Sequence, residues 1–479
     1  MASADLESGT DTGTETPALV ADLAVIGFGK GGKTLAATLA KAGRRVVMIE
    51  QSAQMYGGTC INIGCVPTKA VIYRGEHAEL LGGDADTAEG GARWAAAVGA
   101  TSELTSLLRG KNFAMLDTPD TSIVVTGRAS FVDAHTLLVA AGDDRLTVRA
   151  DTIVINTGAV PAMPDIPGLR VSSRVVTSTE LLALPARPDR LVVLGGGYVG
   201  VEFASMQASF GADVTLLQRG NRILPAEDPD ICDRVAALLT ASGVRVVTGA
   251  TVSGVRDIEG AALVSFTRTD DTVDTVEGDL VLAALGRRPL TDGLGLDAVG
   301  IRTDARGAVL VDEHLRTSLP HVFAVGDVNG GPQFTYVSLD DYRIVLDQLT
   351  GDGTRSTADR AAVPHVVFTT PPLARVGFTE REARATGRPL RTAEREVEAM
   401  ATVPRARIVG DTRGVMKAVT DASTGEILGV TLLAHDAHEM INTVAVAMRL
   451  GATAEQLRDG IYTHPSMTEA LNDVFGALA

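Results

Sequence analysis

The sequence predicts an α/β fold with two Rossmann-type dinucleotide-binding domains and a separate C-terminal α+β domain. Residues 22–50 and 190–219 each have the pattern of a strand, a glycine-rich turn, a helix and a second strand, which is a βαβ unit. A duplicated nucleotide-binding unit indicates two nucleotide cofactors, or one cofactor and one degenerate copy. From about residue 360 the pattern changes and favours an α+β domain. Its expected strands lie near 363–368, 413–420 and 426–433.

The composition excludes several classes of protein. The net charge of −16 argues against nucleic acid or an anionic membrane as a partner, because both need a basic surface. Residues 1–16 are acidic and contain no Lys or Arg, so we expect a disordered leader rather than a secretory signal. The longest apolar stretch, 191–217, carries Glu202 and Asp213, which a membrane helix would not. We therefore expect a soluble, cytoplasmic protein, in which a cysteine pair is catalytic more often than structural.

The first glycine-rich turn follows the strand expected at 23–26 and has the pattern G-x-G-x-x-G. Its glycines, Gly27, Gly29 and Gly32, permit a tight turn and the close approach of a pyrophosphate to a helix N-terminus. Glu50 ends the second strand, 18 residues after Gly32, where a carboxylate can hydrogen-bond an adenosine ribose. The turn and the acid together predict a dinucleotide site.

The same stretch also matches the phosphate-binding loop of nucleoside triphosphatases, because Lys33 and Thr34 follow Gly32. That loop needs a Mg²⁺-holding acid on a later strand and no ribose acid. Glu50 therefore favours the dinucleotide site, and we expect Lys33 and Thr34 on the helix surface.

The second glycine-rich turn differs from the first in the residue that follows its second strand. Gln218 stands at the position of Glu50, and Arg219 and Arg222 come next. A carboxylate would repel the 2′-phosphate of NADPH, whereas arginines can pair with it. We therefore expect NADPH in preference to NADH, the alternative being arginines that only solvate a loop. The glycines of this turn are Gly195, Gly197 and Gly200.

Cys60 and Cys65 form the most specific motif of the chain. With four residues between them at the opening of an expected helix, they can close a small disulfide ring. The helix dipole and Lys69 would lower a thiol pKa and favour the thiolate. A zinc site would need a second ligand pair at short spacing, and the third cysteine, Cys232, stands alone. The other alternative is that Cys60 and Cys65 are buried residues without a chemical role. We expect Cys232 to be an ordinary buried residue.

His464, near the C-terminus, has Glu469 five residues after it. A carboxylate can hold a histidine in one tautomer, so this pair can act as acid and base toward a thiol. A lone histidine is structural more often than catalytic, and the two residues by themselves leave both possibilities open.

Residues 57–69 match the pattern G-G-T-C-x-N-x-G-C-x-P-[ST]-K without a gap. By this motif the chain resembles the pyridine nucleotide–disulfide oxidoreductase family, which includes glutathione reductase, dihydrolipoamide dehydrogenase and mercuric reductase. The resemblance extends over residues 23–475 and implies an FAD-dependent enzyme with a redox-active Cys60–Cys65 disulfide. It implies that Cys60 exchanges with the substrate and that Cys65 contacts the flavin.

The resemblance also implies roles for residues outside this stretch. Lys69 would lie near the flavin and pair with Glu202, and Tyr198 would gate the nicotinamide pocket. His464 and Glu469 match an acid–base dyad that reaches the cysteines of the partner subunit, which implies a homodimer. The remaining residues expected to bind FAD or the nicotinamide nucleotide are Gly58, Thr59, Thr157, Gly158, Gly286 and Asp327.

The implied domains follow one another along the chain. After the leader at 1–16 we expect an FAD-binding domain at 17–160, an NAD(P)H-binding domain at 161–289, a return to the central FAD region at 290–358 and a dimerisation domain at 359–479.

Shorter stretches make the sequence similar to the reactive-chlorine-resistance branch of the family, flavoproteins that reduce hypothiocyanous acid. They include residues 27–30, 32–36, 50–52, 369–372, 403–407 and 438–442. The resemblance implies electron transfer from NADPH through FAD and the disulfide to an oxidised sulfur substrate, with hypothiocyanous acid favoured. The alternatives are a reductase for a low-molecular-weight disulfide or dihydrolipoamide, a Cu²⁺ or Hg²⁺ reductase, and a non-catalytic flavin-binding protein. No cysteine follows Cys232 to form the C-terminal pair of mercuric reductases, and no resident metal is expected.

Overall fold

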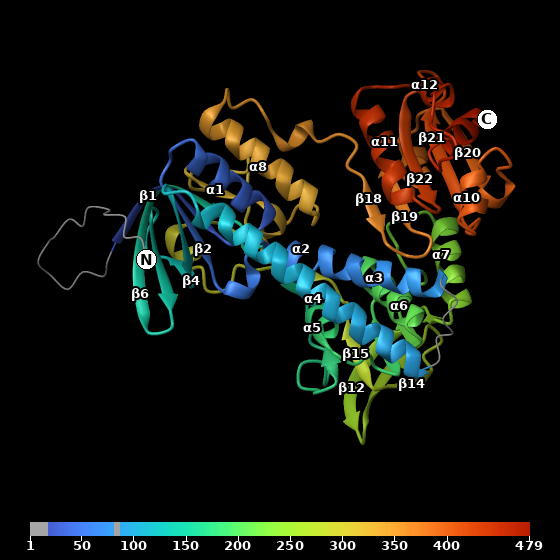
Figure 1. Cartoon of the computed structure of the whole chain (residues 1–479), viewed down its shortest axis with the longest axis horizontal. Coiled ribbons are helices and arrows are strands. Elements are labelled where there is room, and N and C mark those ends of the chain that lie inside the picture. The colour runs from blue at the N-terminus through green and yellow to red at the C-terminus, as the bar shows by residue number, and fades with distance from the viewer. Residues whose placement is uncertain (1–17, 81–86) are drawn as a thin grey trace, which may run out of the picture. The chain divides into compact units, whose positions relative to one another are not determined.

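The computed structural model describes residues 18–80 and 87–479, so the leader expected at 1–16 lies outside the described residues. The chain divides into two compact units (Figure 1). The described residues of the first unit belong to Met1–Ala70, Val98–Ala162 and Gly286–Asp359, and those of the second to Val71–Ala97, Met163–Leu285 and Arg360–Ala479. Helices α3 (Cys65–Leu80) and α4 (Thr87–Asp117) continue from one unit into the other along the chain.

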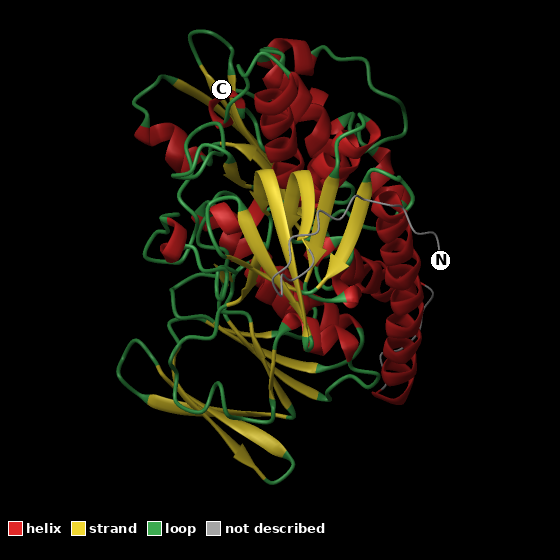
Figure 2. Cartoon of the chain, turned by 90° about the vertical axis from the view of Figure 1, so that its left-hand side faces the viewer, coloured by secondary structure: helices red, strands yellow, loops and turns green. Residues whose placement is uncertain are grey.

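The first unit is built on a seven-stranded sheet, whose strands Figure 2 shows side by side in yellow. The strands are β1 (Ala18–Ile26), β2 (Val46–Glu50), β3 (Ser122–Thr126), β4 (Arg128–Phe131), β5 (Thr136–Ala141), β6 (Asp144–Ile155) and β17 (Val322–Ala324). Their order is β3-β2-β1-β6-β5-β4, with β17 also on β6. The β1, β2, β3, β6 and β17 pairings are parallel, and β4 and β5 add an antiparallel edge.

Helices α1 (Lys30–Lys41) and α8 (Thr335–Thr350) pack together over the first sheet. Leu23 and Val25 of β1 lie in the core beneath these helices, whereas Ala24 and Ile26 belong to the core on the opposite face. Burial on both faces explains why this strand is apolar without alternation. The smaller elements of the unit are α2 (Gly58–Asn62) and the antiparallel pair β7 (Ala159–Pro161) and β16 (Arg287–Pro289).

The second unit begins with a parallel sheet of order β11-β10-β9-β15-β8. Its strands are β8 (Val175–Val176), β9 (Arg190–Leu194), β10 (Asp213–Leu217), β11 (Arg245–Val247) and β15 (Leu280–Ala283), and its helices are α5 (Ser178–Ala183), α6 (Tyr198–Ser209) and α7 (Pro229–Ala241). An antiparallel sheet follows, formed by β12 (Thr251–Ile258), β13 (Ala261–Thr267) and β14 (Val273–Gly278). Both βαβ units expected from the sequence are therefore present, β1-α1-β2 in the first unit and β9-α6-β10 in the second.

The C-terminal part of the second unit is an antiparallel sheet of order β18-β19-β22-β21-β20 with helices packed on it. The strands are β18 (His365–Val367), β19 (Leu373–Gly377), β20 (Leu390–Glu396), β21 (Val415–Asp421) and β22 (Ile427–Leu433). The helices are α9 (Glu380–Ala385), α10 (Pro404–Ile408), α11 (Ala437–Arg449), α12 (Ala454–Arg458) and α13 (Ala470–Gly476). Three of the strands match the expected ones, and β19 and β20 are additional. Of the helices in the described ranges, none is long and apolar enough to cross a membrane.

Candidate active site

Cys60 and Cys65 lie on two consecutive helices of the first unit. Cys60 belongs to α2, and Cys65 is the first residue of α3. Both side chains are reduced thiols, Cys60 half-buried and Cys65 exposed. Gly58 and Thr59 precede Cys60, and a Cβ atom at Gly58 would lie 2.8 Å from the Cα of Gly29. The backbone before Cys60 is therefore pressed against the first glycine turn, which only a residue without a side chain permits.

The pKa of the Cys60 thiol is raised well above its ordinary value. The hydrogen bond with Cys65 is the largest cause and burial the second, while the Thr335 hydroxyl and the positive charge of Lys33 act in the opposite direction. The Cys65 sulfur lies 3.5 Å from the same hydroxyl. The expectation of a lowered thiol pKa is therefore wrong for Cys60 in the dithiol state. The α3 dipole acts at Cys65, and at Cys60 the neighbouring sulfur and burial outweigh it.

Lys33 lies inside the protein, so the expected surface position is wrong for this residue. Its exposed fraction is 4%, and its ammonium donates to the carbonyl oxygen of Gly57 at 3.1 Å and to Asn112 Oδ1 at 2.5 Å. The segment that carries the two cysteines, residues 57–65 (the cysteine segment), and helix α4 therefore cover this face of α1. Thr34, in contrast, is half-buried, and its hydroxyl donates to the carbonyl of Lys30.

Lys69 and Glu202 belong to different units. Lys69 lies on α3, four residues after Cys65, and is half-buried. Glu202 is buried on α6, where its Oε1 accepts a hydrogen bond from the backbone N–H of Phe368 at 2.9 Å. The pairing of Lys69 with Glu202 stays a prediction.

The first glycine turn leads from β1 directly into α1. Gly27 has a φ of +98°, and a Cβ atom there would lie 2.4 Å from the carbonyl oxygen of Asn156. The Gly32 N–H donates to Asn156 Oδ1 at 3.0 Å, which fixes the start of the helix against the end of β6. Gly29 precedes the first residue of α1 and adds no side chain at this N-terminus.

Glu50 lies at the end of β2, beside the first turn. Its carboxylate accepts hydrogen bonds from the N–H groups of Phe28 at 2.9 Å and Ser52 at 3.3 Å. Burial raises the pKa of Glu50, and these N–H groups offset part of that effect. The acid is thus held at the edge of the sheet where a ribose is expected.

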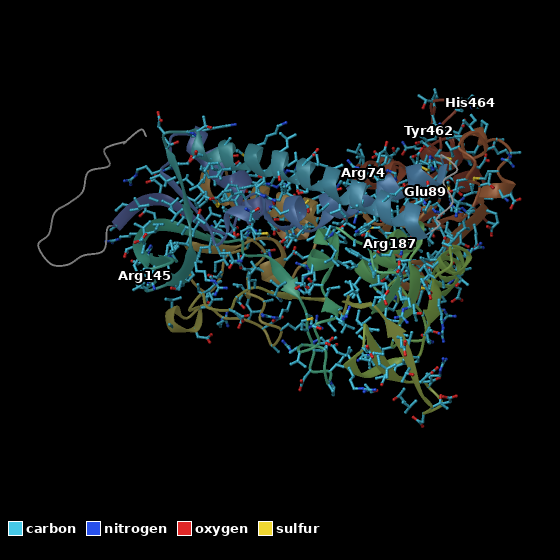
Figure 3. The ribbon with its side chains drawn as sticks, turned by 60° about the horizontal axis from the view of Figure 1, so that its bottom comes forward. Arg74, Glu89, Arg145, Arg187, Tyr462 and His464 are labelled. Atoms are coloured by element: carbon cyan, nitrogen blue, oxygen red, sulfur yellow. The ribbon has the colours of Figure 1, made fainter. Side chains whose placement is uncertain are left out.

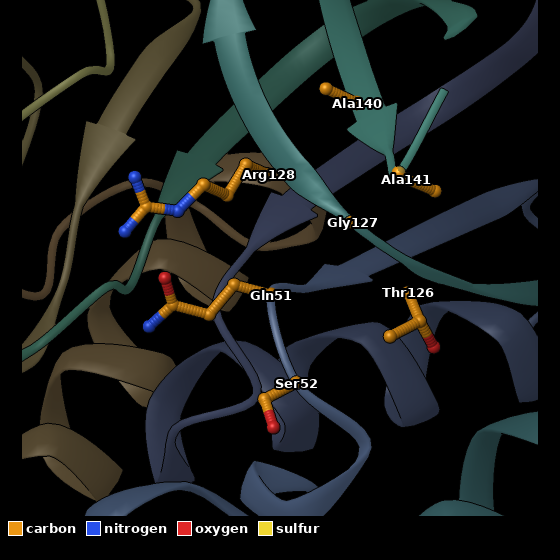
Figure 4. A pocket seen from close by; sticks show the side chains of 8 residues that line it. Gln51, Ser52, Thr126, Gly127, Arg128, Ala140 and Ala141 are labelled. Atoms are coloured by element: carbon orange, nitrogen blue, oxygen red, sulfur yellow. The ribbon is translucent and has the colours of Figure 1, made fainter. Parts of the chain in front are cut away.

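A cavity of about 310 Å³ opens at the carboxyl ends of β1 and β2. Gly27, Glu50, Arg128 and Thr157 are among the residues that line it. A second hollow adjoins it, and Figure 4 shows Gln51 and Arg128 on its wall. Ligands of parallel α/β sheets bind at this edge, so the cavity has the position of an adenosine site.

The other residues expected around a flavin also lie in the first unit. Asp327 follows β17, and burial raises its pKa while the charge of Arg287 acts against that rise. Gly158 has a φ of +72° and Gly286 one of +105°, and they precede the paired strands β7 and β16. The Thr157 hydroxyl donates to the Leu290 carbonyl at 2.6 Å.

The second glycine turn repeats the geometry of the first. Gly195 has a φ of +105°, and a Cβ atom there would lie 2.5 Å from the carbonyl oxygen of Ala284. A Cβ atom at Gly200 would lie 1.8 Å from the carbonyl oxygen of Gly195, and Gly197 precedes α6. Backbone crowding therefore requires glycine at two positions of this turn.

Gln218 occupies the strand end that Glu50 occupies in the first unit. Its Oε1 accepts a hydrogen bond from the N–H of Gly196 at 2.9 Å. Arg219 is exposed, and Arg222 forms an ion pair with Asp233 at 2.8 Å. The sequence did not indicate Asp233 as a partner. Cys232, next to it, is buried as expected, and its thiol donates to the carbonyl of Leu224.

His464 and Glu469 come together as predicted. His464 Nδ1 lies 2.8 Å from Glu469 Oε2, and the other carboxylate oxygen accepts a hydrogen bond from the N–H of Ser466. The His464 side chain is 66% exposed, and Figure 3 shows it with Tyr462 at the outer edge of the C-terminal domain. The imidazole is thus oriented through Nδ1 while Nε2 faces outward.

Comparison with known proteins places these features in one family. Residues 21–341 match the family model described as pyridine nucleotide-disulphide oxidoreductase, and residues 363–475 match the dimerisation domain of that family. The chain belongs to the pyridine nucleotide-disulphide oxidoreductase family. The predicted fold class, two dinucleotide-binding domains with a C-terminal dimerisation domain, is thereby confirmed, as is the predicted flavoprotein oxidoreductase class.

The similar proteins span almost the whole chain. It is 46% identical over 452 residues to the probable pyridine nucleotide-disulfide oxidoreductase RclA of Escherichia coli, covering 94% of this chain and 98% of that protein. The solved Cu(II) complex of that HOCl-induced flavoprotein disulfide reductase superposes with a TM-score of 0.89 at 45% identity, covering 95% of this chain and 99% of the other. Mercuric reductase of Lysinibacillus sphaericus is 35% identical, over 94% of this chain and 81% of that protein.

The flavin that this family carries fits the residues of the first unit. The cavity at the end of β1 is bounded by a glycine that a Cβ atom would block and by a buried acid. The cysteine segment contacts the same turn through Gly58. A dinucleotide held there would therefore extend from Glu50 along the turn beside Cys60.

A buried polar cluster at Tyr198 was missed from the sequence. Tyr198, the first residue of α6, donates a long hydrogen bond of 3.4 Å to Glu227 Oε1 and stacks on His365. Glu227 is 1% exposed, and it also accepts from His365 Nε2 at 3.0 Å and Arg375 Nε at 2.8 Å. Burial tends to raise the pKa of Glu227, but the His365 hydrogen bond and the Arg375 charge bring it below its ordinary value. Burial, with the Glu227 charge, raises the pKa of Tyr198 to about 12.

This cluster draws on residues far apart in the chain, and no spacing rule joins them. The one local signal in the sequence is an acidic residue, Glu227, shortly after the second βαβ unit. In the part of the chain that the structure describes, no group of three or more His, Cys, Asp or Glu side chains is arranged to hold a metal ion.

Proposed function

We propose that this protein is a flavoenzyme of reactive-chlorine defence that passes electrons from NADPH through FAD and the Cys60–Cys65 disulfide to hypothiocyanous acid. The observation that carries the proposal is the thiol pair on consecutive helix ends, in a segment whose backbone touches the first glycine turn. The likeness to an HOCl-induced disulfide reductase supports the choice of an oxidised sulfur or chlorine-derived substrate. We further propose that it works in the reducing cytoplasm, where a catalytic dithiol is maintained.

Bound FAD would accept two electrons from NADPH and transfer them to the disulfide. The residues that would hold it are the turn glycines, Glu50 at the ribose, Asp327 at the ribityl chain, and Thr157 with Gly158 elsewhere in the flavin domain. Lys69 would lie at the flavin and be oriented by Glu202. Gly58 and Thr59 would press the cysteine segment against the flavin, and Gly286 would complete the wall of the site.

The dithiol would then reduce hypothiocyanous acid in two displacements. The Cys60 thiolate attacks the substrate sulfur and forms an S–S bond with it. The S–O bond breaks, and the departing hydroxide takes a proton and becomes water. Cys65 attacks the Cys60 sulfur, displaces thiocyanate and restores the disulfide. The sum is one NADPH and one hypothiocyanous acid converted to NADP⁺, thiocyanate and water.

His464 would supply the proton to the leaving hydroxide. Its Nδ1 is held by Glu469, so the outward Nε2 is free to exchange a proton with a substrate. We propose that this happens across a homodimer, with His464 reaching the cysteines of the partner subunit. The match to the dimerisation domain supports that arrangement.

The nucleotide would be NADPH rather than NADH. Gln218 places a neutral amide where a carboxylate would repel the 2′-phosphate. Arg219 is exposed, and Arg222 would exchange its surface ion pair with Asp233 for the phosphate. Tyr198 would cover the nicotinamide pocket.

A substrate panel tests the proposal. NADPH oxidation by the holoenzyme is measured with hypothiocyanous acid, glutathione disulfide, mycothiol disulfide, lipoamide, Hg²⁺ and Cu²⁺. We expect the highest kcat/KM with hypothiocyanous acid. A higher value with a disulfide or with a metal ion would replace the proposed substrate by that one, and no turnover with any of them would point to a non-catalytic flavoprotein.

A further inference from the structure

Lys33 is a buried cation beneath the cysteine segment. It lies in the first turn of α1, and its ammonium donates to the carbonyl oxygen of Gly57 and to Asn112 Oδ1. Both acceptors are neutral. Throughout the described ranges, no carboxylate forms an ion pair with this ammonium, so its charge is not compensated by an acid.

Keeping this charge inside the protein is unfavourable, because a desolvated ammonium loses much of its hydration free energy. Burial and, to a smaller extent, the charge of Lys30 lower the pKa of Lys33 from 10.5 to about 8, while Cys60 acts to raise it. The side chain therefore still carries its proton at neutral pH. The corresponding position of α6 is filled by Val201, an apolar residue that is fully buried. Packing at this position of the helix therefore does not by itself require a charged side chain.

The charge faces the end of the segment that carries Cys60. Gly57 immediately precedes α2, and Cys60 is the third residue of that helix. The influence is mutual, since the Lys33 charge favours the Cys60 thiolate and the thiolate favours the charged lysine. The other groups that act on Cys60 are Cys65, which opposes its ionisation, and Thr335, which favours it.

We propose that Lys33 is a positioning residue for the reactive thiol: its buried ammonium holds the cysteine segment by Gly57 and stabilises the thiolate of Cys60. The inference rests on the proposed function, in which Cys60 is the thiol that attacks the substrate. The charge of Lys33 counteracts part of the rise that Cys65 and burial cause in the pKa of Cys60. Without it, the attacking thiolate would be populated far less at neutral pH.

The test measures the reactivity of Cys60 without any substrate turnover. The FAD-loaded enzyme is reduced and desalted under anaerobic conditions, and the rate of Cys60 alkylation by iodoacetamide is followed from weakly acidic to alkaline pH, with the site identified by peptide mass spectrometry. Lys33→Met is compared with the wild type. Lys33→Arg keeps the charge, and Asn112→Leu removes one acceptor while leaving the charge in place.

We expect Lys33→Met to raise the apparent pKa of Cys60 by about one unit, so that alkylation at neutral pH slows about tenfold. Lys33→Arg and Asn112→Leu should stay within about threefold of the wild type. The difference between wild type and Lys33→Met should narrow above about pH 8, where Lys33 loses its own proton. Lys33→Gln takes the place of Lys33→Met if the latter does not retain flavin.

Two results would overturn the inference. One is a Cys60 alkylation profile in Lys33→Met that matches the wild type at every pH. The other is an equal slowing in Lys33→Met and Asn112→Leu, which would reduce Lys33 to a structural tie. Failure of the proposed function is seen separately, because a Cys60→Ser enzyme that still reduces hypothiocyanous acid would refute that function whatever the alkylation rates are.

Discussion

The two glycine turns of this chain share a backbone and differ in charge. Gly27 and Gly195 have nearly the same φ, +98° and +105°, and each would clash with a carbonyl if it carried a Cβ atom. At both strand ends a side-chain oxygen, of Glu50 in the first unit and of Gln218 in the second, accepts a hydrogen bond of 2.9 Å from a backbone N–H of the turn. One oxygen belongs to an acid and the other to an amide.

A second difference lies one residue after the third glycine. Lys33 follows Gly32 and is buried under the cysteine segment, while Val201 follows Gly200 and packs in an apolar core. The shared backbone is set by steric crowding, which only glycine relieves. The choice of ligand and the chemistry are set by a few charged or neutral side chains placed on that backbone.

The largest expected effect is on the free energy of unfolding, and it concerns the buried contacts that the second glycine turn makes. Lys30 begins α1, whereas Tyr198 begins α6 and is tied to the C-terminal domain through Glu227 and Arg375. Arg375→Met leaves the Glu227 carboxylate buried without its cation, so we expect the free energy of unfolding to fall by about 3–5 kcal/mol. Chemical denaturation measures it, and the double variant with Glu227→Gln should recover most of the loss. A single variant as stable as the wild type would show that Glu227 is not held by Arg375.

Lys33 should make the stability of the folded protein depend on pH, an effect that has no counterpart at the second glycine turn. Its pKa in the folded protein is lowered from 10.5 to about 8, so below about pH 8 the folded state bears the full cost of the charge. As pH rises toward 10.5 the unfolded chain still binds the proton and the folded one does not, so stability should rise. The rise relative to Lys33→Met is about 3 kcal/mol. Denaturation of both proteins over this range measures the difference, and parallel pH profiles would contradict the buried ammonium.

Exchanging the acid and the amide should alter ligand choice without altering the fold. In Gln218→Glu the new carboxylate would face the 2′-phosphate, so we expect the preference for NADPH over NADH, as a ratio of kcat/KM, to fall about 100-fold, or about 2.7 kcal/mol. The matched control is Glu50→Gln, which should weaken FAD retention and leave the nucleotide ratio unchanged. An unchanged ratio in Gln218→Glu would mean that Gln218 does not lie at the phosphate.

The sequence predicts what depends on local spacing. The glycine turns, the strand-end residues Glu50 and Gln218 and the His464–Glu469 contact follow from short-range patterns, and each is present in the structure. The duplicated βαβ pattern predicts the two nucleotide-binding domains, and the family resemblance adds that the C-terminal domain is a dimerisation domain.

The sequence does not predict the features that depend on packing between distant segments. Lys33 has the sequence position of a surface residue, but it is buried and contacts Gly57 of the cysteine segment and Asn112 of α4. The Glu227 cluster joins α6, β18 and β19, which no periodicity connects. Strand β20 was missed because it is an edge strand rich in charged residues.

The central claim is that electrons reach the substrate through the Cys60 thiol. In the Cys60→Ser enzyme, rapid mixing with NADPH should reduce the flavin at a rate comparable to that of the wild type, because hydride transfer does not involve this sulfur. Steady-state reduction of hypothiocyanous acid should fall at least 1,000-fold, since the attacking thiolate is gone. Turnover of hypothiocyanous acid at the wild-type rate in this variant would contradict the account.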